Sequence, residues 1–220
     1  GDATQDSVSL TSESQLIPAD GFVGSVPTQD VVVRFAKGHE GDQDFQVFFV
    51  GIISSTDWPE PGRVKFSLIM LSATMQREGL TLAFQRSCRN VLYSQGRGAC
   101  NANKEDFRVD ATVVTTNQGE VAMVGLAGYP DGWFDGGFIE WDDSVKGIER
   151  RTIERYMGGD SIQLFGLSDG LFEDMEVRVY AGCAHTAQAC DEKFNNMDNY
   201  GGQPQLPGDS PFDGDPIGGT

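Results

Sequence analysis

FRVDATVVTTNQGEVAMVGL, residues 107–126, is the stretch that most clearly indicates the class of fold. Residues 107–116 are rich in the β-branched and aromatic residues that favour strands. Residues 117–119, Asn-Gln-Gly, are a turn signal, because Asn and Gly tolerate the backbone angles that tight turns require. Residues 121–126 then return as a second strand. The stretch therefore predicts an antiparallel pair of strands.

Strands of similar composition lie on both sides of this pair. Turn signals separate them, for example Pro-Asp-Gly at 130–132 and Gly-Gly-Asp at 158–160. Many short strands with frequent turns indicate a mainly β protein with two barrel- or sandwich-like regions, and not alternating βαβ units. The predicted strands are residues 30–36, 45–53, 63–72, 107–116, 121–126, 133–141, 148–156, 161–165 and 175–180.

Two of these strands carry more specific expectations. Residues 45–53, FQVFFVGII, are almost continuously apolar, which indicates a strand covered on both faces. In residues 133–141, WFDGGFIEW, the two adjacent glycines indicate a β-bulge or a close approach of backbone. We expect the two tryptophans of this strand to be core or interface anchors.

Helix is scarce in the sequence. Residues 73–78 have room for one or two turns, and residues 186–195, TAQACDEKFN, are the best candidate, with Thr186 as the N-cap. This is the one short C-terminal helix that we predict. From Asn199 the chain is rich in Gly and Pro, so we expect an extended C-terminal tail that is ordered only by docking.

Composition and charge limit the possible functions. Of the 220 residues 39% are hydrophobic, enough for packed cores. We predict an N-terminal β domain over residues 1–85, a second β domain over 86–182, and a cysteine-containing helix and tail over 183–220. With 33 acidic residues against 16 basic ones, the net charge of -17 disfavours DNA, RNA and anionic membranes as partners. No apolar run approaches the roughly 18 residues that span a bilayer.

Four cysteines form two pairs, Cys88/Cys100 and Cys183/Cys190. Neither spacing is the C-x-x-C motif of common zinc sites and ferredoxin loops. From spacing alone, one shared metal or cluster, two disulfides and buried thiols all remain open.

Helix geometry constrains the second pair. Seven positions along one helix span about 10 Å, whereas a disulfide needs its Cα atoms within about 7 Å. Two sulfurs on one zinc ion lie closer still. Cys183 must therefore lie in the loop before the helix, where Gly182 allows the backbone to turn.

The remaining candidates are weaker. His185 lies between two cysteines, but a packing or surface histidine is the simpler interpretation, and His39 falls in a turn that we expect to be exposed. Glu140 and Asp142 share one face of a strand, as a glycosidase pair could, although a solvated strand end is the simpler interpretation. The sequence contains no nucleophile elbow, P-loop or dinucleotide fingerprint.

Three stretches together resemble the baseplate hub, or tail-tip, proteins of long-tailed siphophages and of gene transfer agents: residues 79–100, 131–141 and 182–217. In that family a Tyr-Gln-Arg strand end precedes a Cys-x-x-x-Leu-Tyr stretch, and a Gly-Cys…Cys helix leads to FGN, N(Y/F)GGFP and, in one branch, NPF.G.PI. The matching residues here are Phe84, Gln85, Arg86, Cys88, Leu92, Tyr93, Cys183, Cys190, Phe194, Asn195, Asn196, the NYGG of 199–202 and the PFDGDPI of 211–217.

The resemblance implies a structural virion protein, not an enzyme, that forms a homotrimer at the tail tip. Such a hub connects the distal tail ring to the central tip or fibre proteins and is assembled in the host cytoplasm. The family is distantly similar to the lambda-type tail-tip protein, which implies a [4Fe-4S] cluster on Cys88, Cys100, Cys183 and Cys190, with zinc as the alternative. Specific nucleic-acid binding and a membrane segment are not expected.

The sequence departs from the family pattern in three ways. The family's second cysteine falls where this chain has Arg97, so Cys100 implies a three-residue loop insertion. Gln203 replaces an aromatic residue of the GGFP motif. Family members also carry further N-terminal strands, so we expect strands upstream of Gly1.

Two other classes of function compete with the hub. One is a secreted, disulfide-linked β-sandwich that binds carbohydrate on a stacking face of Trp133, Trp141 and Tyr156. The other is a hydrolase that uses Glu140 and Asp142.

Overall fold

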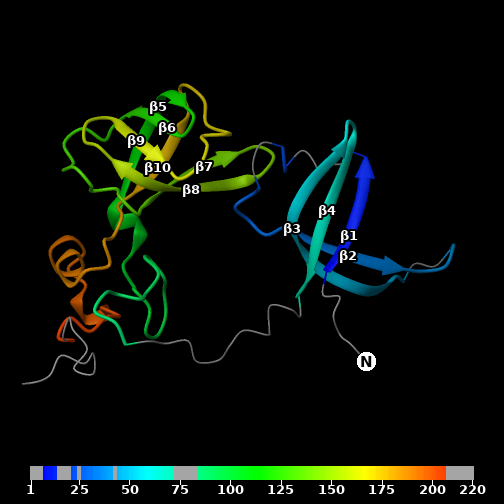
Figure 1. Ribbon diagram of the computed structural model, residues 1–220, viewed down its shortest axis with the longest axis horizontal. Coiled ribbons are helices and arrows are strands. Elements are labelled where there is room, and N and C mark those ends of the chain that lie inside the picture. Colours follow the sequence, from blue (N-terminus) through cyan, green and yellow to red (C-terminus); the bar gives the residue numbers. More distant parts are fainter. Residues whose placement is uncertain (1–6, 14–20, 24–25, 42–43, 72–83, 207–220) are drawn as a thin grey trace, which may run out of the picture.

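The computed structural model describes residues 7–13, 21–23, 26–41, 44–71 and 84–206 (Figure 1). Strands dominate and form two groups, an open four-stranded sheet and a closed barrel. Helix is limited to short segments in the described part of the chain. The prediction of a mainly β protein is therefore confirmed.

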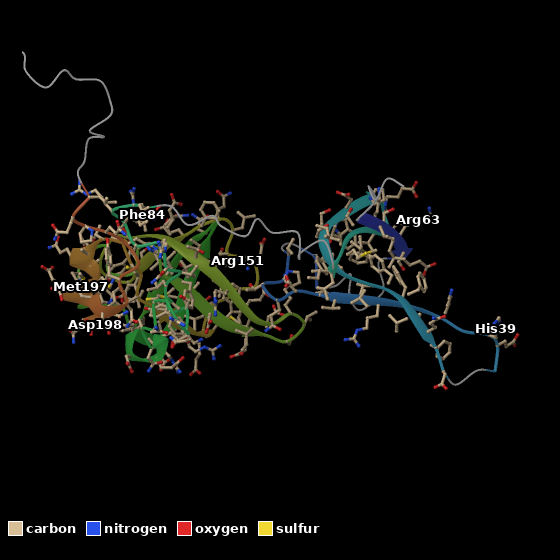
Figure 2. The ribbon with its side chains drawn as sticks, turned by 90° about the horizontal axis from the view of Figure 1, so that it is seen from below. His39, Arg63, Phe84, Arg151, Met197 and Asp198 are labelled. Carbon is tan, nitrogen blue, oxygen red and sulfur yellow. The ribbon has the colours of Figure 1, made fainter. Side chains whose placement is uncertain are left out.

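The open sheet has the order β1-β4-β3-β2, and all neighbours are antiparallel. Its strands are β1 (Ser7–Glu13), β2 (Val32–Lys37), β3 (Gln46–Glu60) and β4 (Arg63–Met70). Pro61 and Gly62 connect β3 to β4, and the φ of 82° at Gly62 suits the third position of a type II turn. The hairpin of β2 and β3 extends to the region of His39 (Figure 2).

The prediction that residues 45–53 are covered on both faces is wrong. Phe49 and Ile53 are buried, whereas Phe48, directly before Phe49, is 62% exposed, so the strand has one core face and one open face. Side chains alternate across a strand, and only one face of this sheet meets a core. That core consists of Phe22, Phe49, Ile53, Val64, Phe66 and Leu68.

The barrel closes in the order β10-β5-β6-β9-β8-β7, with β7 pairing to β10. Its strands are β5 (Arg108–Asn117), β6 (Glu120–Val124), β7 (Phe138–Asp143), β8 (Gly147–Tyr156), β9 (Ser161–Leu164) and β10 (Glu176–Tyr180). The predicted pair of strands is present as β5 and β6. Gln118 and Gly119 connect them with φ angles of 49° and 107°, as a type I′ turn requires.

The barrel interior is a packed core of apolar side chains. Its members include fully buried large side chains such as Trp141 and Tyr156, each 1% exposed. The core residues are Ala111, Val113, Val121, Met123, Leu126, Phe134, Ile139, Trp141, Ile153, Tyr156, Ile162, Leu164, Leu171, Val177 and Val179.

The predicted strand over residues 133–141 forms only in its second half. Residues 131–136 make a turn, and β7 begins at Phe138. The cause is the glycine pair. Gly136 has a φ of 72°, and a Cβ on Gly137 would lie 2.1 Å from the Tyr180 carbonyl oxygen. The expected close approach of backbone is therefore confirmed, and the strand begins only after it.

Thr28 ties the segment before β2 to the barrel. The backbone N–H of Thr28 donates to Glu149 Oε1 at 2.9 Å, and its hydroxyl donates to the Arg150 carbonyl at 3.1 Å. The same hydroxyl accepts from the Arg150 backbone N–H at 2.9 Å. The Thr28 hydroxyl thus makes both hydrogen bonds to the Arg150 backbone that the backbone of a residue in a neighbouring strand would make.

The predicted helical turn over residues 73–78 lies outside the described residues. Among the described helices, none has the length and apolar content to cross a bilayer.

Replacing Gly137 by alanine should destabilise the barrel by about 2–4 kcal/mol, because the added Cβ overlaps the backbone of Tyr180 and Gly182. Thermal unfolding followed by circular dichroism measures the change. Gly159→Asn is the matched control, because Gly159 has open space around it and Asn tolerates its φ of 68°. An unchanged melting temperature for Gly137→Ala would contradict the close approach.

Candidate functional site

All four cysteines line one enclosed pocket next to the barrel. They come from two segments: the first cysteine loop, residues 84–103, and the C-terminal segment, residues 182–206. All four are free thiols, with Cys190 buried and the other three half-buried. The other residues that line the pocket are Asn90, Leu92, His185, Phe194, Asn196 and Asn199.

The C-terminal segment places its two cysteines as the helix geometry requires. Cys183 lies in the irregular stretch after β10, and Cys190 lies in the short π-helix η3 (Ala189–Lys193). Thr186 caps the helix, because its hydroxyl accepts from the Ala189 N–H at 3.1 Å. The predictions of a loop position for Cys183 and an N-cap at Thr186 are confirmed, whereas the helix is shorter than the predicted residues 186–195.

The first cysteine loop brings Cys100 to the pocket despite the altered spacing. Arg97, at the position where the resembling family has its cysteine, is exposed. Between them the loop turns on itself, with Gly96 N–H donating to Asn101 Oδ1 at 2.8 Å and Ala99 N–H donating to the Gly96 carbonyl. This compact turn over residues 96–101 leaves Cys100 at the pocket despite the altered spacing.

Backbone N–H groups point at two of the sulfurs. Gly201 N–H donates to Cys88 Sγ at 3.2 Å, and His185 N–H donates to Cys183 Sγ at 3.3 Å. Such bonds favour the thiolate over the thiol. N–H···S bonds are also among the features that tune metal–thiolate centres.

Two of the thiols, Cys183 and Cys190, are held in their neutral form. Burial raises the pKa of Cys183, and burial together with the neighbouring cysteines raises the pKa of Cys190 to about 11. The neighbouring cysteines oppose ionisation of these two thiols because the charges would be alike. A metal that binds four thiolates would therefore have to displace their protons, as metal ions do at cysteine sites.

His185 orients the loops around the pocket. Its ring Nδ1 lies 3.1 Å from the Cys88 carbonyl oxygen, and its own carbonyl accepts from the Cys88 N–H at 2.8 Å. Its positive φ of 57° allows these contacts and the N–H···S bond to Cys183 at the same time. His185 is thus a packing residue, as interpreted from the sequence, and His39 is exposed on the distant hairpin (Figure 2).

Asparagines join the two segments. Asn196 Nδ2 donates to the Cys100 carbonyl at 2.6 Å, and Asn199 Nδ2 donates to Asn196 Oδ1 at 2.7 Å. From the first cysteine loop, Asn90 and Asn101 donate to the carbonyl and the side-chain oxygen of Asn199, each at 3.0 Å. Sequence reasoning did not assign these roles, although the recurring asparagines of the family motif were the available signal.

Two glycines let the C-terminal segment lie directly on the loop. A Cβ on Gly202 would lie 2.5 Å from the Arg86 carbonyl oxygen, and one on Gly201 would lie 2.5 Å from Asn90 Oδ1. The Tyr200 hydroxyl donates to the same Arg86 carbonyl at 2.7 Å. The two glycines of the NYGG motif therefore lie against the first cysteine loop at positions where a side chain would not fit.

An aromatic cluster supports the pocket from the barrel side. Tyr93 contacts Phe138, Tyr180 and Phe194 edge-on, with ring centroids 6.0–6.5 Å apart. Its hydroxyl donates to the Ala181 carbonyl at 2.6 Å, two residues before Cys183. This bond fixes the end of β10 relative to the first cysteine loop.

The carboxylate pair does not form a hydrolytic site. Glu140 is 3% exposed and not solvated as expected. Burial alone would raise the pKa of Glu140, but the hydrogen bond and charge of Arg150, with help from Lys104, lower it below its ordinary value. A carboxylate held ionised between two cations is a poor general acid. Asp142 is paired separately with Arg178 at 3.1 Å.

The proposed carbohydrate-stacking face is not formed either. Trp141 and Tyr156 lie inside the barrel core, and only Trp133 is partly accessible. The expectation of Trp141 as a core anchor is confirmed.

Two properties bear on what the cysteine pocket could hold. The volume left between its side chains is about 10 Å³, the room of one water-sized sphere. In addition, no three His, Cys, Asp or Glu side chains of the described chain are arranged to hold a single metal ion. Cysteine side chains rotate readily between rotamers, so a bound group could enlarge so small a space and reorient the sulfurs. The donor set itself fits both zinc and an iron–sulfur cluster.

Comparison with known proteins finds similarity to a family model and to solved structures. The model of a family described as phage conserved hypothetical protein BR0599 matches residues 132–210, which include Cys183, Cys190 and the asparagines of the C-terminal segment. A chain in the virion of a native gene transfer agent particle has a similar fold, with a TM-score of 0.61 and 23% identity over 80% of this chain. The match spans 62% of that chain. No curated protein matches the sequence.

Tyr93→Phe should lower the free energy of unfolding by about 1–2 kcal/mol, because the buried Ala181 carbonyl loses its hydroxyl donor. Urea unfolding followed by tryptophan fluorescence measures the loss. Tyr129→Phe, at a tyrosine that is 37% exposed, is the control and should change stability little. Equal losses for both variants would show that the Tyr93 bond does not hold the loop.

Proposed function

We propose that the chain is a structural protein of a phage or gene transfer agent virion, and that it forms the baseplate hub at the tip of a long non-contractile tail. The observation that carries this proposal is the similarity of fold to a chain of a gene transfer agent virion over 80% of this chain. The family match to a phage protein over residues 132–210 is a second support, because it covers the C-terminal segment.

The proposed tail-tip position is supported by the sequence motifs and by the contact that two of these motifs make with each other in the structure. The CRNVLY and NYGG motifs lie against each other, with Gly201 N–H on Cys88 Sγ. Motifs over a hundred positions apart in sequence thus serve one contact, as expected if they come from one ancestral hub. By the same resemblance we propose a homotrimer that binds the distal tail protein and the central hub or fibre protein.

We further propose that Cys88, Cys100, Cys183 and Cys190 hold a structural [4Fe-4S] cluster. The four thiols share one pocket, and four thiolates are the donor set that a [4Fe-4S] cluster takes. Disulfides between these cysteines are disfavoured in the reducing host cytoplasm, where such a particle would be assembled. The bound group would supply a cross-link between the two segments, and no electron transfer is needed for that.

Gold-labelled antibody against the chain should bind intact particles of the phage or gene transfer agent that encodes it, at the end of the tail opposite the capsid. Negative-stain electron microscopy gives the position, and antibody against the major tail-tube protein is the control. Label along the tube or on the capsid would contradict the hub position.

Cys183→Ser should free the chain from Asn199 onward for proteolysis, because the proposed cross-link through Cys183 holds the C-terminal segment on the loop. Limited digestion with mass spectrometry of the fragments follows the loss. Ser168→Ala, in a turn far from the pocket, is the control. Identical fragments at identical rates in the variant and the parent would count against the cross-link.

A further inference from the structure

Lys193 places its charge directly behind one cysteine of the pocket. It is the last residue of η3, and its ammonium donates to the Gly182 carbonyl at 2.7 Å and also to the Trp133 carbonyl. The Gly182 carbonyl belongs to the peptide bond that joins Gly182 to Cys183. The cation is therefore one peptide unit away from a candidate ligand.

The surroundings of this cation are apolar. The Lys193 ammonium lies 4.3 Å from the ring centroid of Trp133 and 5.6 Å from that of Phe194. Both rings take the place of water, and a charge acts more strongly on its neighbours where water is excluded. The acidic groups that face the ammonium are the Cys183 thiol and the Asp135 carboxylate.

Four thiolates around a metal group would leave a net negative charge. Four cysteine thiolates outweigh a zinc ion or an oxidised cluster core by about two charges. No Lys or Arg lines the pocket itself, and Asp191 next to Cys190 adds a further negative charge. Among the described residues in contact with this site, Lys193 supplies a cation where such a complex would need one.

We propose that Lys193 is the charge partner of the four-thiolate centre: it stabilises the negative complex and raises the reduction potential of the cluster. The inference rests on the cluster proposed above. Reduction adds one negative charge to the cluster, and a nearby cation in an apolar setting favours the more negative state. Its hydrogen bonds to two carbonyls hold the cation in place.

The test compares midpoint potentials of the full chain, loaded anaerobically with iron and sulfide. Lys193→Met removes the charge and keeps an unbranched apolar stem on Trp133, whereas Lys193→Arg keeps the charge. Lys65→Met, on β4 of the open sheet, removes an equal charge far from the pocket. Redox titration followed by visible absorbance and electron paramagnetic resonance gives each potential.

The potential of Lys193→Met should shift negative, with the ratio of reduced to oxidised cluster at a fixed potential falling about tenfold, or about 59 mV for one electron. Lys193→Arg and Lys65→Met should keep the parent value. If Lys193→Met fails to fold, Lys193→Gln replaces it, since its amide can still donate to a carbonyl without a charge.

Three outcomes would overturn the inference. An unchanged potential in a fully loaded Lys193→Met or Lys193→Gln variant would do so, as would an equal shift in Lys193→Arg, which would mean that Lys193 matters only for packing. A parent chain that takes up no iron and sulfide would instead contradict the proposed cluster, and the inference with it. These failures are distinguishable by the metal content of the parent chain.

Discussion

The contact between the first cysteine loop and the C-terminal segment is the constraint on which the candidate site depends. Neither segment has a strand partner, so their backbone groups must find hydrogen bonds elsewhere. They find them in each other, for example Gln203 N–H on the Gln85 carbonyl and Cys88 N–H on the His185 carbonyl. Glycines remove the side chains that would keep them apart, and asparagines complete the pairing. The pocket of four thiols exists only because this contact forms.

Local sequence patterns were sufficient where neighbouring residues determine the structure. The β5–β6 turn follows from Gln118 and Gly119, since a two-residue connection of this kind needs positive φ angles. The position of Cys183 before the helix follows from helix rise alone. The convergence of the cysteines was expected only from the resemblance to a family, because spacing leaves the pairing open.

Local patterns failed where a distant segment determines the structure. Residues 133–137 have strand composition, but the backbone of Tyr180 and Gly182 passes so close to Gly137 that a strand cannot start there. The apolar run of β3 predicts two covered faces, yet the sheet meets a core on one face only. β1 has just two apolar residues, and its pairing with β4 could not be inferred from them. Glu140 is buried because Arg150 and Lys104 come to it from elsewhere in the chain.

We propose that the four cysteines jointly bind one metal group, and that this group joins the two segments. Anaerobic purification of the full chain, followed by iron, sulfide and zinc analysis and by native and denaturing mass spectrometry, tests it most directly. We predict a brown protein with about four iron and four sulfide per chain, all lost together when any one cysteine is replaced by serine. A colourless, metal-free protein whose denatured mass is lower by four protons would mean two disulfides and would contradict the account.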